Sequence, residues 1–543
     1  MYNSGILSFG LSSQPALPPK RAAMLLLVSL AVCLALRIWL VCNTESITKD
    51  GAGYIEMARR WSDDPADALR SVRLQPGYPA AISWAHRLLI AFGGPTDILG
   101  WDLAGQAVSV AASVVAMLAV WFFASALMDR RIACIAVLLF SIARKWSQDG
   151  ADVIADALAV CFELWTMVLA LWVLRFLGSR CGVAMLLAAL TGIVGAAAYY
   201  ARMEAIHIVV VVAACWLIFC GWRGKKWLRA SAAVGVMLAA VALCVVPYML
   251  YIGGPTNDDV FQNFFSRAAG DDVAYVRAGM FLWLWESLSD SSLVRFVGQL
   301  FEAMHPVLGV AMCIWLVTWL AGKATRSQLL TSIAVSPRGP GVALLVGSLI
   351  IMAWATITNY QRAGYFSHRY LLLNAAMLSS LSAGGVVVLA NWVAVLGGRL
   401  PRRLNPRVIT WLVTGVVGGF MLAHALRPLH DNKEYIREAG LYIAQQAREG
   451  DFLLTDRALI LHYAQIEGRA LTGPIATQRI ISWAGRRDKP ATLLAISDCA
   501  LPDERTTMCR YLRREGFVPL NKFFRGGEEG GDVIIVFRLS RQP

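Results

Sequence analysis

The sequence predicts an all-α polytopic membrane protein followed by a small soluble α/β domain. Hydrophobic residues occupy 57% of the 543 positions and charged residues only 16%, and the mean hydropathy is +0.55. Soluble domains carry about 25% charged residues, and a helix needs about 20 mostly apolar residues to cross a bilayer. Many windows of the sequence meet that length, and the pattern becomes that of a soluble domain after about residue 427.

Eleven apolar segments predict about 11 transmembrane helices. They lie near 22–42, 103–128, 132–143, 153–174, 182–200, 204–221, 230–252, 304–321, 341–358, 370–396 and 408–427. The third segment is too short to cross alone, so we expect it to extend into flanking polar residues or to be partly re-entrant. Another apolar stretch, at 78–92, is short and lies between polar segments, which favours an interfacial helix.

Basic residues concentrate in alternate connections between these segments, and acidic residues concentrate in the others. The basic connections are Arg130-Arg131, Arg175 to Arg180, Arg223 to Arg229, Lys323 to Arg338 and Arg399 to Arg407. The positive-inside rule therefore places the N-terminus in the cytoplasm, and an odd number of crossings places the C-terminus outside. Topology accounts for the net charge of +14, and no basic patch interleaved with aromatic residues predicts a nucleic-acid partner.

These assignments divide the chain into three parts. We expect a cytoplasmic leader at 1–21, a transmembrane domain at 22–427 with an exterior loop at 43–100, and an exterior α/β domain at 428–543. Nine of the 11 cysteines lie in or beside apolar segments, where they act as small apolar residues. Cys499 and Cys509 in the last domain can pair in an oxidising compartment or remain free.

The exterior loop contains the most informative motif. Asp50 directly follows the first apolar segment, and Tyr54 lies one helical turn later on the same face. Gly51 and Gly53 leave the backbone near Asp50 uncovered, so that a bulky substrate can approach. A carboxylate in this place can accept a proton from an attacking hydroxyl or amine. The alternative is that Asp50 only caps the N-terminus of a helix.

A second acidic cluster opens the fourth apolar segment. Asp156 precedes a continuous apolar run and is the acid in this cluster that we expect inside the membrane boundary. An acid at that depth costs about 2.5–3.5 kcal/mol on insertion scales, so it is a functional candidate. We expect Asp149 and Asp152 to be solvated, whereas Glu163, deeper in the segment, can be a buried polar link between helices.

Arg202 and Glu204 lie at the turn between the fifth and sixth segments. The guanidinium of Arg202 can offer paired N–H donors to a phosphate, which the ammonium of a lysine cannot do in the same planar way. Glu204 can orient that arginine. The alternative is an ordinary structural ion pair at a helix turn.

A cationic cluster precedes the tenth segment. Arg362, His368 and Arg369 place up to three cations beside tyrosines, including Tyr370. Tyrosine and arginine at an interface are often membrane anchors, but the density of this group favours an anion site. Arg37, about one turn inside the first segment, is interpreted as a side chain that snorkels to the interface.

Four clusters that are far apart in sequence are thus expected on one face of the membrane. Acids dominate the first two clusters and cations the last two, which suits a lipid-linked phosphate donor and a carboxylate that activates an acceptor. The sequence has no P-loop and no GxGxxG motif, so the energy for transfer would come from a preformed lipid–phosphate bond. A transporter would more often carry charges near mid-bilayer and broken, repeated helices.

At this point the sequence resembles membrane glycosyltransferases of the GT-C fold. It is most similar to bacterial relatives of the protein O-mannosyltransferases and of the aminoarabinose transferases that modify lipid A (glycosyltransferase families 39 and 83), over nearly the whole chain. The family's first outer loop carries an Asp with a Tyr four residues later, which Asp50 and Tyr54 match. Its Pro-Pro-Leu-Tyr-like element is echoed by Gln75-Pro-Gly-Tyr-Pro79, and its second acid corresponds best to Asp156.

Two further motifs carry the resemblance. The family's Thr-Arg-Pro-Glu-Gly element resembles Ala201-Arg-Met-Glu-Ala205, which contains Arg202 and Glu204. A late Arg-Tyr-Leu-Leu-Pro element resembles Arg369-Tyr-Leu-Leu-Leu373. The chain departs from the family at Gly51, where many members have Glu, and at Met203 and Leu373, where the family has Pro.

The resemblance implies transfer of a sugar from a polyprenyl-phosphate donor to a lipid, glycan or protein acceptor at the outer face. Asp50 would be the general base, and Tyr54 and Asp156 would shape the acceptor side. Arg202 or Arg369 would hold the departing phosphate. Glu204, His368 and Tyr370 are the further candidates for substrate binding. Direct displacement by one activated acceptor implies inversion at the anomeric carbon.

The remaining expectations concern cofactors, location and the rival function. No metal site or other cofactor follows from these residues, although some related oligosaccharyltransferases use a divalent cation. The expected location is the inner membrane of a bacterium, with a periplasmic active site. The alternative function is a transporter or flippase for lipid-linked sugars.

Overall fold

The computed structural model describes most of the chain. The described residues are 18–71, 74–222, 227–254, 291–321, 339–363, 367–397, 405–430, 433–471, 492–498, 512, 516–524 and 533–539. Cys499 and Cys509 lie outside these ranges, as does most of the expected leader at 1–21.

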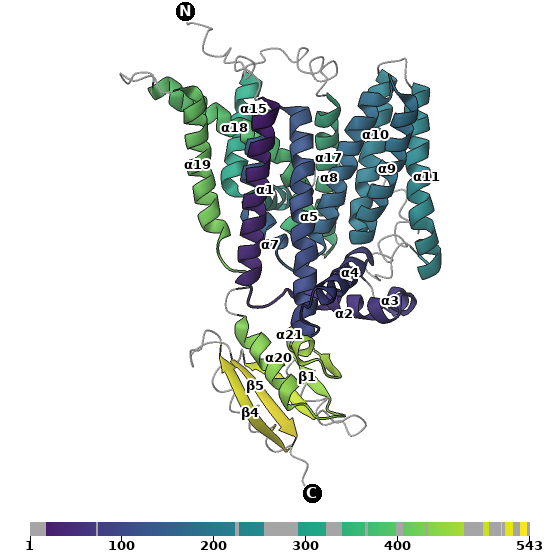
Figure 1. Cartoon of the computed structure of the whole chain (residues 1–543), viewed down its shortest axis with the longest axis vertical. Coiled ribbons are helices and arrows are strands. Elements are labelled where there is room, and N and C mark those ends of the chain that lie inside the picture. Colours follow the sequence, from purple (N-terminus) through teal and green to yellow (C-terminus); the bar gives the residue numbers. More distant parts are fainter. Residues whose placement is uncertain are drawn as a thin grey trace, which may run out of the picture.

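Long apolar helices form a bundle that confirms the expected fold class (Figure 1). Within the described residues, nine helices are long and apolar enough to cross a membrane, some of them continued by a short 3-10 turn (η1 or η2). The helices are α1 (Pro19–Cys42), α5 (Ile98–Leu127), α8 (Asp156–Phe176), α9 (Cys181–Ala201), α10 (His207–Trp222, after η1, Met203–Ile206), α11 (Trp227–Ile252), α17 (Gly339–Ala363), α18 (Leu372–Gly397, after η2, His368–Leu371) and α19 (Pro406–Ala425). A tenth span is formed if α14 (Ser291–Met304) and α15 (Pro306–Ala321) are counted together.

The α14–α15 pair is sharply bent. The two helices meet at an angle of 109°, and His305 between them has a φ of +80°, a conformation that side-chain-bearing residues rarely adopt. Pro306 follows and lacks the N–H that would continue the helical hydrogen bonds. His305 is buried and its Nε2 lies 3.2 Å from Nδ1 of His424. This histidine pair therefore stabilises the bend and is not part of the cationic cluster that precedes the tenth segment.

The third predicted segment is broken, in agreement with its short apolar run. It forms α6 (Arg130–Ser141) and α7 (Arg144–Asp149), and the helical hydrogen bonding is interrupted between them. The Arg37 side chain is fully buried and donates hydrogen bonds to the carbonyl oxygens of Ser141 and Trp146 on either side of the break. The snorkelling interpretation of Arg37 is therefore wrong, because this guanidinium satisfies backbone carbonyls that the break leaves without helical partners.

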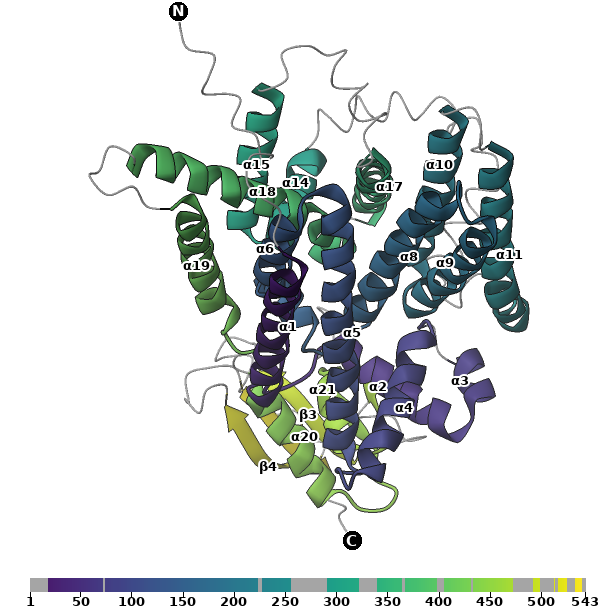
Figure 2. The same ribbon diagram turned by 45° about the horizontal axis from the view of Figure 1, so that its top comes forward.

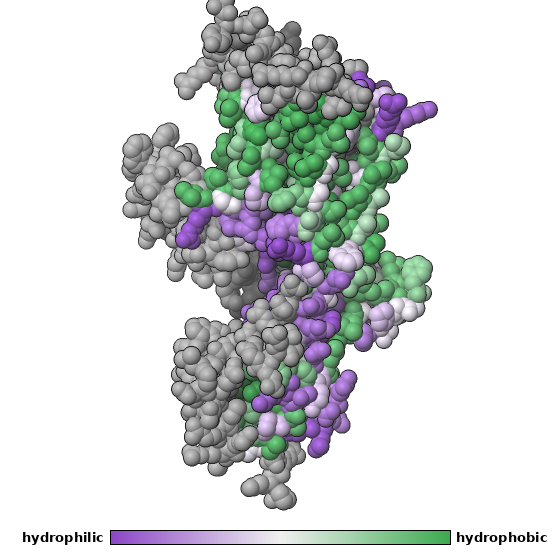
Figure 3. All heavy atoms as spheres, turned by 90° about the vertical axis from the view of Figure 1, so that its left-hand side faces the viewer, coloured by the Kyte–Doolittle hydropathy of each residue, from purple (hydrophilic) through white to green (hydrophobic). Residues whose placement is uncertain are grey.

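The bundle has a central helix and an apolar outer surface. In α18 the most apolar window is 94% buried, against 28% for those of α1, α11 and α19 at the periphery. Figure 3 shows apolar residues over much of one face of the bundle, with hydrophilic residues gathered nearer the C-terminal domain. Apolar side chains exposed over this length require lipid around them, so the chain is an integral membrane protein.

Three shorter helices lie across the end of the bundle that carries the C-terminal domain, here called the domain end. They are α2 (Lys49–Asp63), α3 (Pro65–Ser71) and α4 (Gly77–Ala91), and Figures 1 and 2 show them beside the lower part of α5. Trp84, Leu88 and Phe92 leave a strongly exposed apolar surface on and just after α4. This is the pattern expected of a helix in the membrane interface.

Within the part of the chain that the structure describes, the C-terminal domain is a five-stranded sheet with helices against it. Its elements are α20 (Glu434–Gln446), β1 (Leu453–Thr455), α21 (Ala458–Ala464), β2 (Gly468–Ala470), β3 (Leu493–Asp498), β4 (Phe517–Phe524) and β5 (Val533–Leu539). The strand order is β2-β1-β3-β5-β4, with β1 parallel to β2 and β3, and β5 antiparallel to β3 and β4. Alternate side chains of β3 and β5 enter two different apolar cores, as the pleat of a strand requires.

One of these cores joins the domain to the first loop. Ile47 and Ile55 on the loop side pack in the same cluster as Ile460 and Tyr463 of α21. The backbone N–H of Ile47 donates to the Tyr463 hydroxyl at 3.3 Å. The domain therefore holds the segment that begins α2, which is where the candidate base lies.

Candidate active site

Asp50 stands in the first turn of α2 and is not its cap. Thr48 is the N-cap, because its hydroxyl accepts a hydrogen bond from the Gly51 N–H at 3.0 Å. Asp50 lies two residues later with 55% of its side chain exposed, and its Oδ2 accepts a hydrogen bond from Nη1 of Arg369 at 2.9 Å. The positive end of the helix dipole stabilises a carboxylate there. The capping alternative is thus wrong, and Asp50 faces a cation from η2.

The loop before α8 fixes the start of α2. The Oδ1 atom of Asp152 accepts a hydrogen bond from the Thr48 N–H at 3.2 Å, and the Thr48 hydroxyl donates to the Val153 carbonyl at 3.4 Å. Oδ2 of Asp152 lies 2.7 Å from Nε2 of His430, which follows α19. Asp152 is buried, so the expectation that it is solvated is wrong. It connects α2, the α7–α8 loop and the segment leading to the C-terminal domain.

Gly51 serves packing rather than access to substrate. A Cβ atom at this position would lie 2.9 Å from the Val153 carbonyl oxygen, closer than real Cβ atoms come. Gly51 is buried against that loop, whereas Gly53 has only a Leu74 side-chain atom at 3.5 Å from its Cβ position. The expectation that Gly51 uncovers the backbone for a substrate is therefore wrong, and a side chain there would push α2 away from Val153.

Asp149 is also largely shielded from solvent rather than solvated. Its side chain is 13% exposed and its Oδ2 lies 3.8 Å from Nε2 of His368. Burial, together with the nearby carboxylate of Asp156, raises the pKa of Asp149 to about 8, although the Arg369 guanidinium opposes the rise. His368, which precedes Arg369 in η2, therefore lies beside Asp149.

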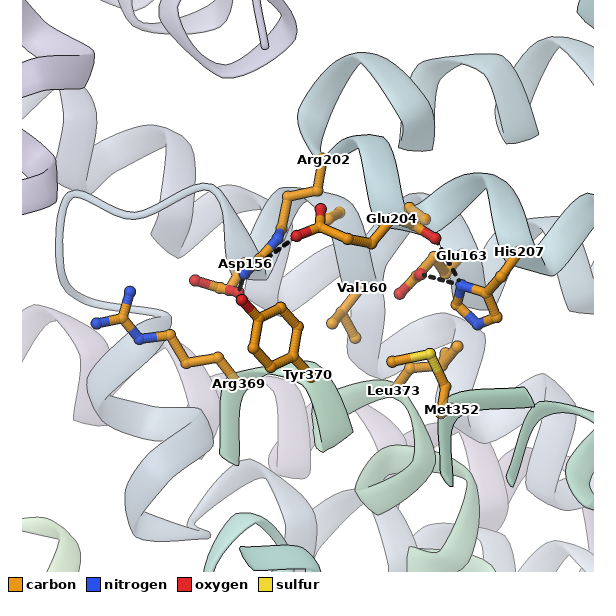
Figure 4. Close-up of a pocket in the computed structure, with 12 residues that line it drawn as sticks. Asp156, Val160, Glu163, Arg202, Glu204, His207, Met352, Arg369, Tyr370 and Leu373 are labelled. Carbon is orange, nitrogen blue, oxygen red and sulfur yellow. Dashed lines mark hydrogen bonds and ion pairs between the residues drawn. The ribbon is translucent and has the colours of Figure 1, made fainter. Parts of the chain in front are cut away.

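Asp156 and Arg202 form the buried ion pair of the site. Asp156 is the first residue of α8 with 3% of its side chain exposed, and an Nη1 hydrogen bond joins Arg202 to it. Arg202 follows α9 in an extended conformation and also contacts Glu204 Oε1 at 3.2 Å (Figure 4). Its guanidinium lies 5.1 Å from the centre of the Tyr370 ring, within the range of a cation–π contact. The structural ion-pair alternative for Arg202 thus stays open beside the phosphate-binding one.

Tyr54 completes the cluster from the side of α2. Its ring meets the ring of Tyr78 edge-on at 5.1 Å, and the buried Tyr78 hydroxyl donates to the Gly105 carbonyl at 3.0 Å. Burial raises the pKa of Tyr54 above its usual range, the Arg202 guanidinium opposes this, and the carboxylates of Asp156 and Asp50 add to it. Tyr54 is therefore a neutral phenol that can donate one hydrogen bond at physiological pH.

The structure gathers the predicted candidates at the domain end of the bundle. Asp50, Tyr54, Asp156, Arg202, Glu204, Arg369 and Tyr370 lie in one cluster, with His368 at its rim. The Arg362 side chain lies outside what the structure describes. The two central carboxylates are each paired with a guanidinium, a donor set that does not fit a divalent cation. Within the described residues, no three His, Cys, Asp or Glu side chains are grouped to hold a metal ion.

Sequence reasoning missed the histidine partners of the buried acids. His207 lies 3.7 Å from Glu163, His430 pairs with Asp152, and His462 lies 2.9 Å from Asp102. Asp102 could have been noticed as an acid near the start of an apolar segment, by the reasoning applied to Asp156. No local signal marks His430 or His462, because their partners lie 278 and 360 residues away.

Comparisons with known proteins support the fold. No protein-family model matches the sequence, and no curated protein matches it in a sequence search. Among solved structures, this chain is similar to the oligosaccharyltransferase AglB from Archaeoglobus fulgidus in complex with an inhibitory peptide and a dolichol-phosphate. The TM-score is 0.59 at 12% identity, and the match covers 96% of this chain and 74% of that one. A complex of the Archaeoglobus fulgidus oligosaccharyltransferase with Zn and sulfate is similar with a TM-score of 0.60 and 11% identity. This match covers 95% of this chain and 73% of that one.

A third solved structure matches along nearly the whole length of both chains. ArnT from Cupriavidus metallidurans bound to undecaprenyl phosphate is similar with a TM-score of 0.53 and 12% identity, over 94% of this chain and 97% of that one. At such identities the likeness concerns the fold alone. The chain therefore has the GT-C fold of these membrane glycosyltransferases, as its motifs predicted.

Proposed function

We propose that this protein is a membrane glycosyltransferase that moves a sugar from a polyprenyl-phosphate donor to an acceptor, with inversion at the anomeric carbon. The observation that carries the proposal is the exposed ion pair of Asp50 and Arg369, at 2.9 Å, on a GT-C scaffold. The pair joins a carboxylate that can take up a proton to a guanidinium that can bind phosphate. Structures with the same fold hold dolichol-phosphate or undecaprenyl phosphate, which supports a lipid-linked donor.

The exposure of the pair suggests how donor binding prepares the base. An exposed ion pair contributes about 0–1 kcal/mol, so the phosphodiester anion of the donor can compete for the Arg369 guanidinium at little cost. Once Arg369 binds the phosphate, the Asp50 carboxylate loses its cationic partner and its Oδ2 is free to contact the acceptor. Binding of the donor would then activate the base in the same step.

The transfer itself needs one proton movement and one displacement. Asp50 takes the proton of an acceptor hydroxyl or amine as that atom bonds to the anomeric carbon of the sugar. The bond between the anomeric carbon and the phosphate oxygen breaks, and polyprenyl phosphate leaves with its charge held by Arg369 and Arg202. Because phosphate is a good leaving group, the second acid that glycosidases use is not required. Asp156 and Glu204 fix Arg202, whose guanidinium also lies over the Tyr370 ring.

A reconstituted system tests this function. The full-length protein is placed in liposomes with undecaprenyl phosphate that carries a radiolabelled sugar, and a bacterial cell-envelope extract supplies acceptors. We expect label to move from the carrier to an acceptor, with Asp50→Asn protein as the inactive control. Passage of intact donor between the leaflets without transfer would contradict the proposal and favour the flippase.

We also propose that the domain end faces the periplasm of a bacterial cell. The basic connections at Arg130-Arg131 and Arg175 to Arg180 lie at the opposite end of the bundle from the C-terminal domain (Figure 1). A basic residue near an anionic membrane surface is worth about 1 kcal/mol, which favours that end in the cytoplasm. Reporters fused after Arg229 should read as cytoplasmic and reporters fused after Gly440 as exterior. A cytoplasmic signal from Gly440 would overturn this orientation.

A further inference from the structure

A cavity extends from the ion pairs into the bundle. It lies between α8, α10, α17 and α18, and Arg202, Arg369 and Tyr370 line the part nearest Asp50. Glu163 and His207 line its inner part, where Figure 4 shows them facing each other beyond Val160. Glu163 follows Asp156 by seven residues on α8, which is two turns on the same face and about 10 Å further along the axis.

The inner part of this cavity offers hydrogen-bond acceptors without donors to match them. Nδ1 of His207 donates to the Glu204 carbonyl at 2.9 Å, so Nε2 of the neutral ring carries a lone pair. That Nε2 is buried and has no hydrogen-bond partner among the described residues. The Glu163 carboxyl group is 8% exposed, and its nearest polar contact is His207 Nδ1 at 3.7 Å, beyond hydrogen-bond distance.

Buried acceptors that lack a hydrogen-bond donor can be satisfied by a ligand that donates hydrogen bonds. A buried carboxyl group that makes no hydrogen bond is costly, and two buried acceptors side by side are best satisfied by hydroxyl or ammonium groups on one ring. The apolar side chains of Val160, Met352 and Leu373 line the same cavity and can contact the C–H face of that ring. A lipid tail would find an apolar wall here but would leave both acceptors unsatisfied.

We infer that Glu163 and His207 form a specificity subsite that binds the hydroxyl or ammonium groups of the transferred sugar. The inference rests on the proposed function, because the phosphate at Arg202 and Arg369 would place the attached sugar within reach of the cavity. Glu163 and His207 would thus select among donors that share one lipid carrier. The two arginines would bind the phosphate of all such donors alike.

The test separates sugar recognition from carrier binding. Binding and transfer are measured for undecaprenyl phosphate alone, for its glucosyl, mannosyl and aminopentosyl forms, and for deoxy analogues of the best of these. We expect Glu163→Gln and His207→Asn each to lower kcat/KM for the best sugar by about 10- to 100-fold, because each loses a hydrogen bond to a charged or buried partner. Affinity for undecaprenyl phosphate alone should stay within about twofold of wild type, which also shows that the variants fold.

The deoxy analogues identify the contact. Loss of the recognised hydroxyl should weaken wild-type protein strongly and should have little added effect in Glu163→Gln. An aminopentosyl donor preferred over both hexosyl donors would assign the contact to an ammonium, and the reverse would assign it to a hydroxyl. Asp102→Asn is the matched control, because Asp102 is a buried acid paired with His462 outside the cavity, and it should leave the sugar preference unchanged.

Two results would overturn the inference, and they are distinguishable. If wild-type protein transfers sugar but both variants keep its preference among donors, the subsite is wrong and the proposed function stands. If wild-type protein transfers no sugar from any donor, the proposed function fails and the subsite fails with it. Should a variant not fold, the deoxy series on wild-type protein decides, since equal rates for all analogues exclude a polar sugar contact.

Discussion

Two aspartate–arginine pairs lie in the same cluster and differ mainly in exposure. In the pair of Asp50 and Arg369 the side chains are 55% and 29% exposed, whereas in the pair of Asp156 and Arg202 they are 3% and 20% exposed. Both aspartates stand in the first turn of a helix. The exposed pair can be reached by an acceptor and opened by a phosphate, but opening the buried pair leaves a charge without its partner. Exposure therefore separates a group suited to proton transfer from one suited to positioning.

The largest expected effect comes from the exposed acid. Asp50→Asn should lower turnover by about 10²- to 10⁴-fold, the usual cost of removing a general base, because asparagine cannot take up the proton. The melting temperature should change little, since an exposed pair contributes little to stability. Transfer assays and thermal unfolding on the same preparation measure both. Asp63→Asn, at the other end of α2, is the control and should match wild type in each.

The buried acid should behave in the opposite way. Asp156→Asn should destabilise the protein by up to about 3 kcal/mol, because Arg202 loses its buried partner but keeps Glu204. Turnover of the folded fraction should remain measurable. Thermal unfolding in detergent checks the first point. An Asp156→Asn protein as stable as wild type would show that the buried pair does not hold the site together.

Arg369 and Arg60 should differ in their effect on the affinity for undecaprenyl phosphate. Arg369→Ala should weaken binding of undecaprenyl phosphate by about 10- to 100-fold, the cost of losing charge-assisted hydrogen bonds to phosphate. Arg60→Ala, on the exposed face of α2, is a control for lost surface charge. Binding can be followed by isothermal titration in detergent. Unchanged affinity in Arg369→Ala would remove the role of Arg369 in releasing Asp50.

Sequence reasoning predicted the helices well because the bilayer imposes their length. Nearly every apolar run of about 20 residues became a long helix, and the shortest run, 132–143, became the broken α6–α7 element. It did not predict which polar groups are buried. Arg37 was interpreted as a snorkelling side chain from its place in the segment, but the break that it satisfies lies about 100 residues later. Such pairings depend on how the helices meet, which local periodicity does not contain.

The same limit applies within the site. The spacing of Asp50 and Tyr54 indicated a loop of interest, yet the partner of Asp50 is Arg369, 319 residues away. Asp149 and Asp152 were expected to be solvated because Asp156, not they, directly precedes the continuous apolar run, but His368 and His430 come from η2 and from the chain after α19 to cover them. Local sequence thus identified which acids cluster, whereas the tertiary fold determines which of these side chains are exposed to solvent.

The smallest expected effect concerns Asp149 and pH. Burial raises the pKa of Asp149 to about 8, so the folded state favours its neutral form. The stabilisation that neutral Asp149 contributes is fully present below about pH 4, which is its pKa in the unfolded chain. It is lost as the pH rises through 8. Between pH 6 and 9 the melting temperature of wild type should therefore fall by about 1–2 °C more than that of Asp149→Asn. Parallel curves for the two proteins would contradict the buried, neutral Asp149.

Single-turnover transfer with donor already bound tests the central claim most directly, because it isolates the chemical step from binding. Wild-type, Asp50→Asn and Asp156→Asn proteins are saturated with labelled undecaprenyl-phosphate sugar, mixed with acceptor and sampled in time. We predict that Asp50→Asn binds the donor normally but transfers at less than about 1% of the wild-type rate, whereas folded Asp156→Asn transfers measurably. Near-normal transfer by Asp50→Asn, together with an inactive but folded Asp156→Asn, would contradict the assignment and make the buried acid the base.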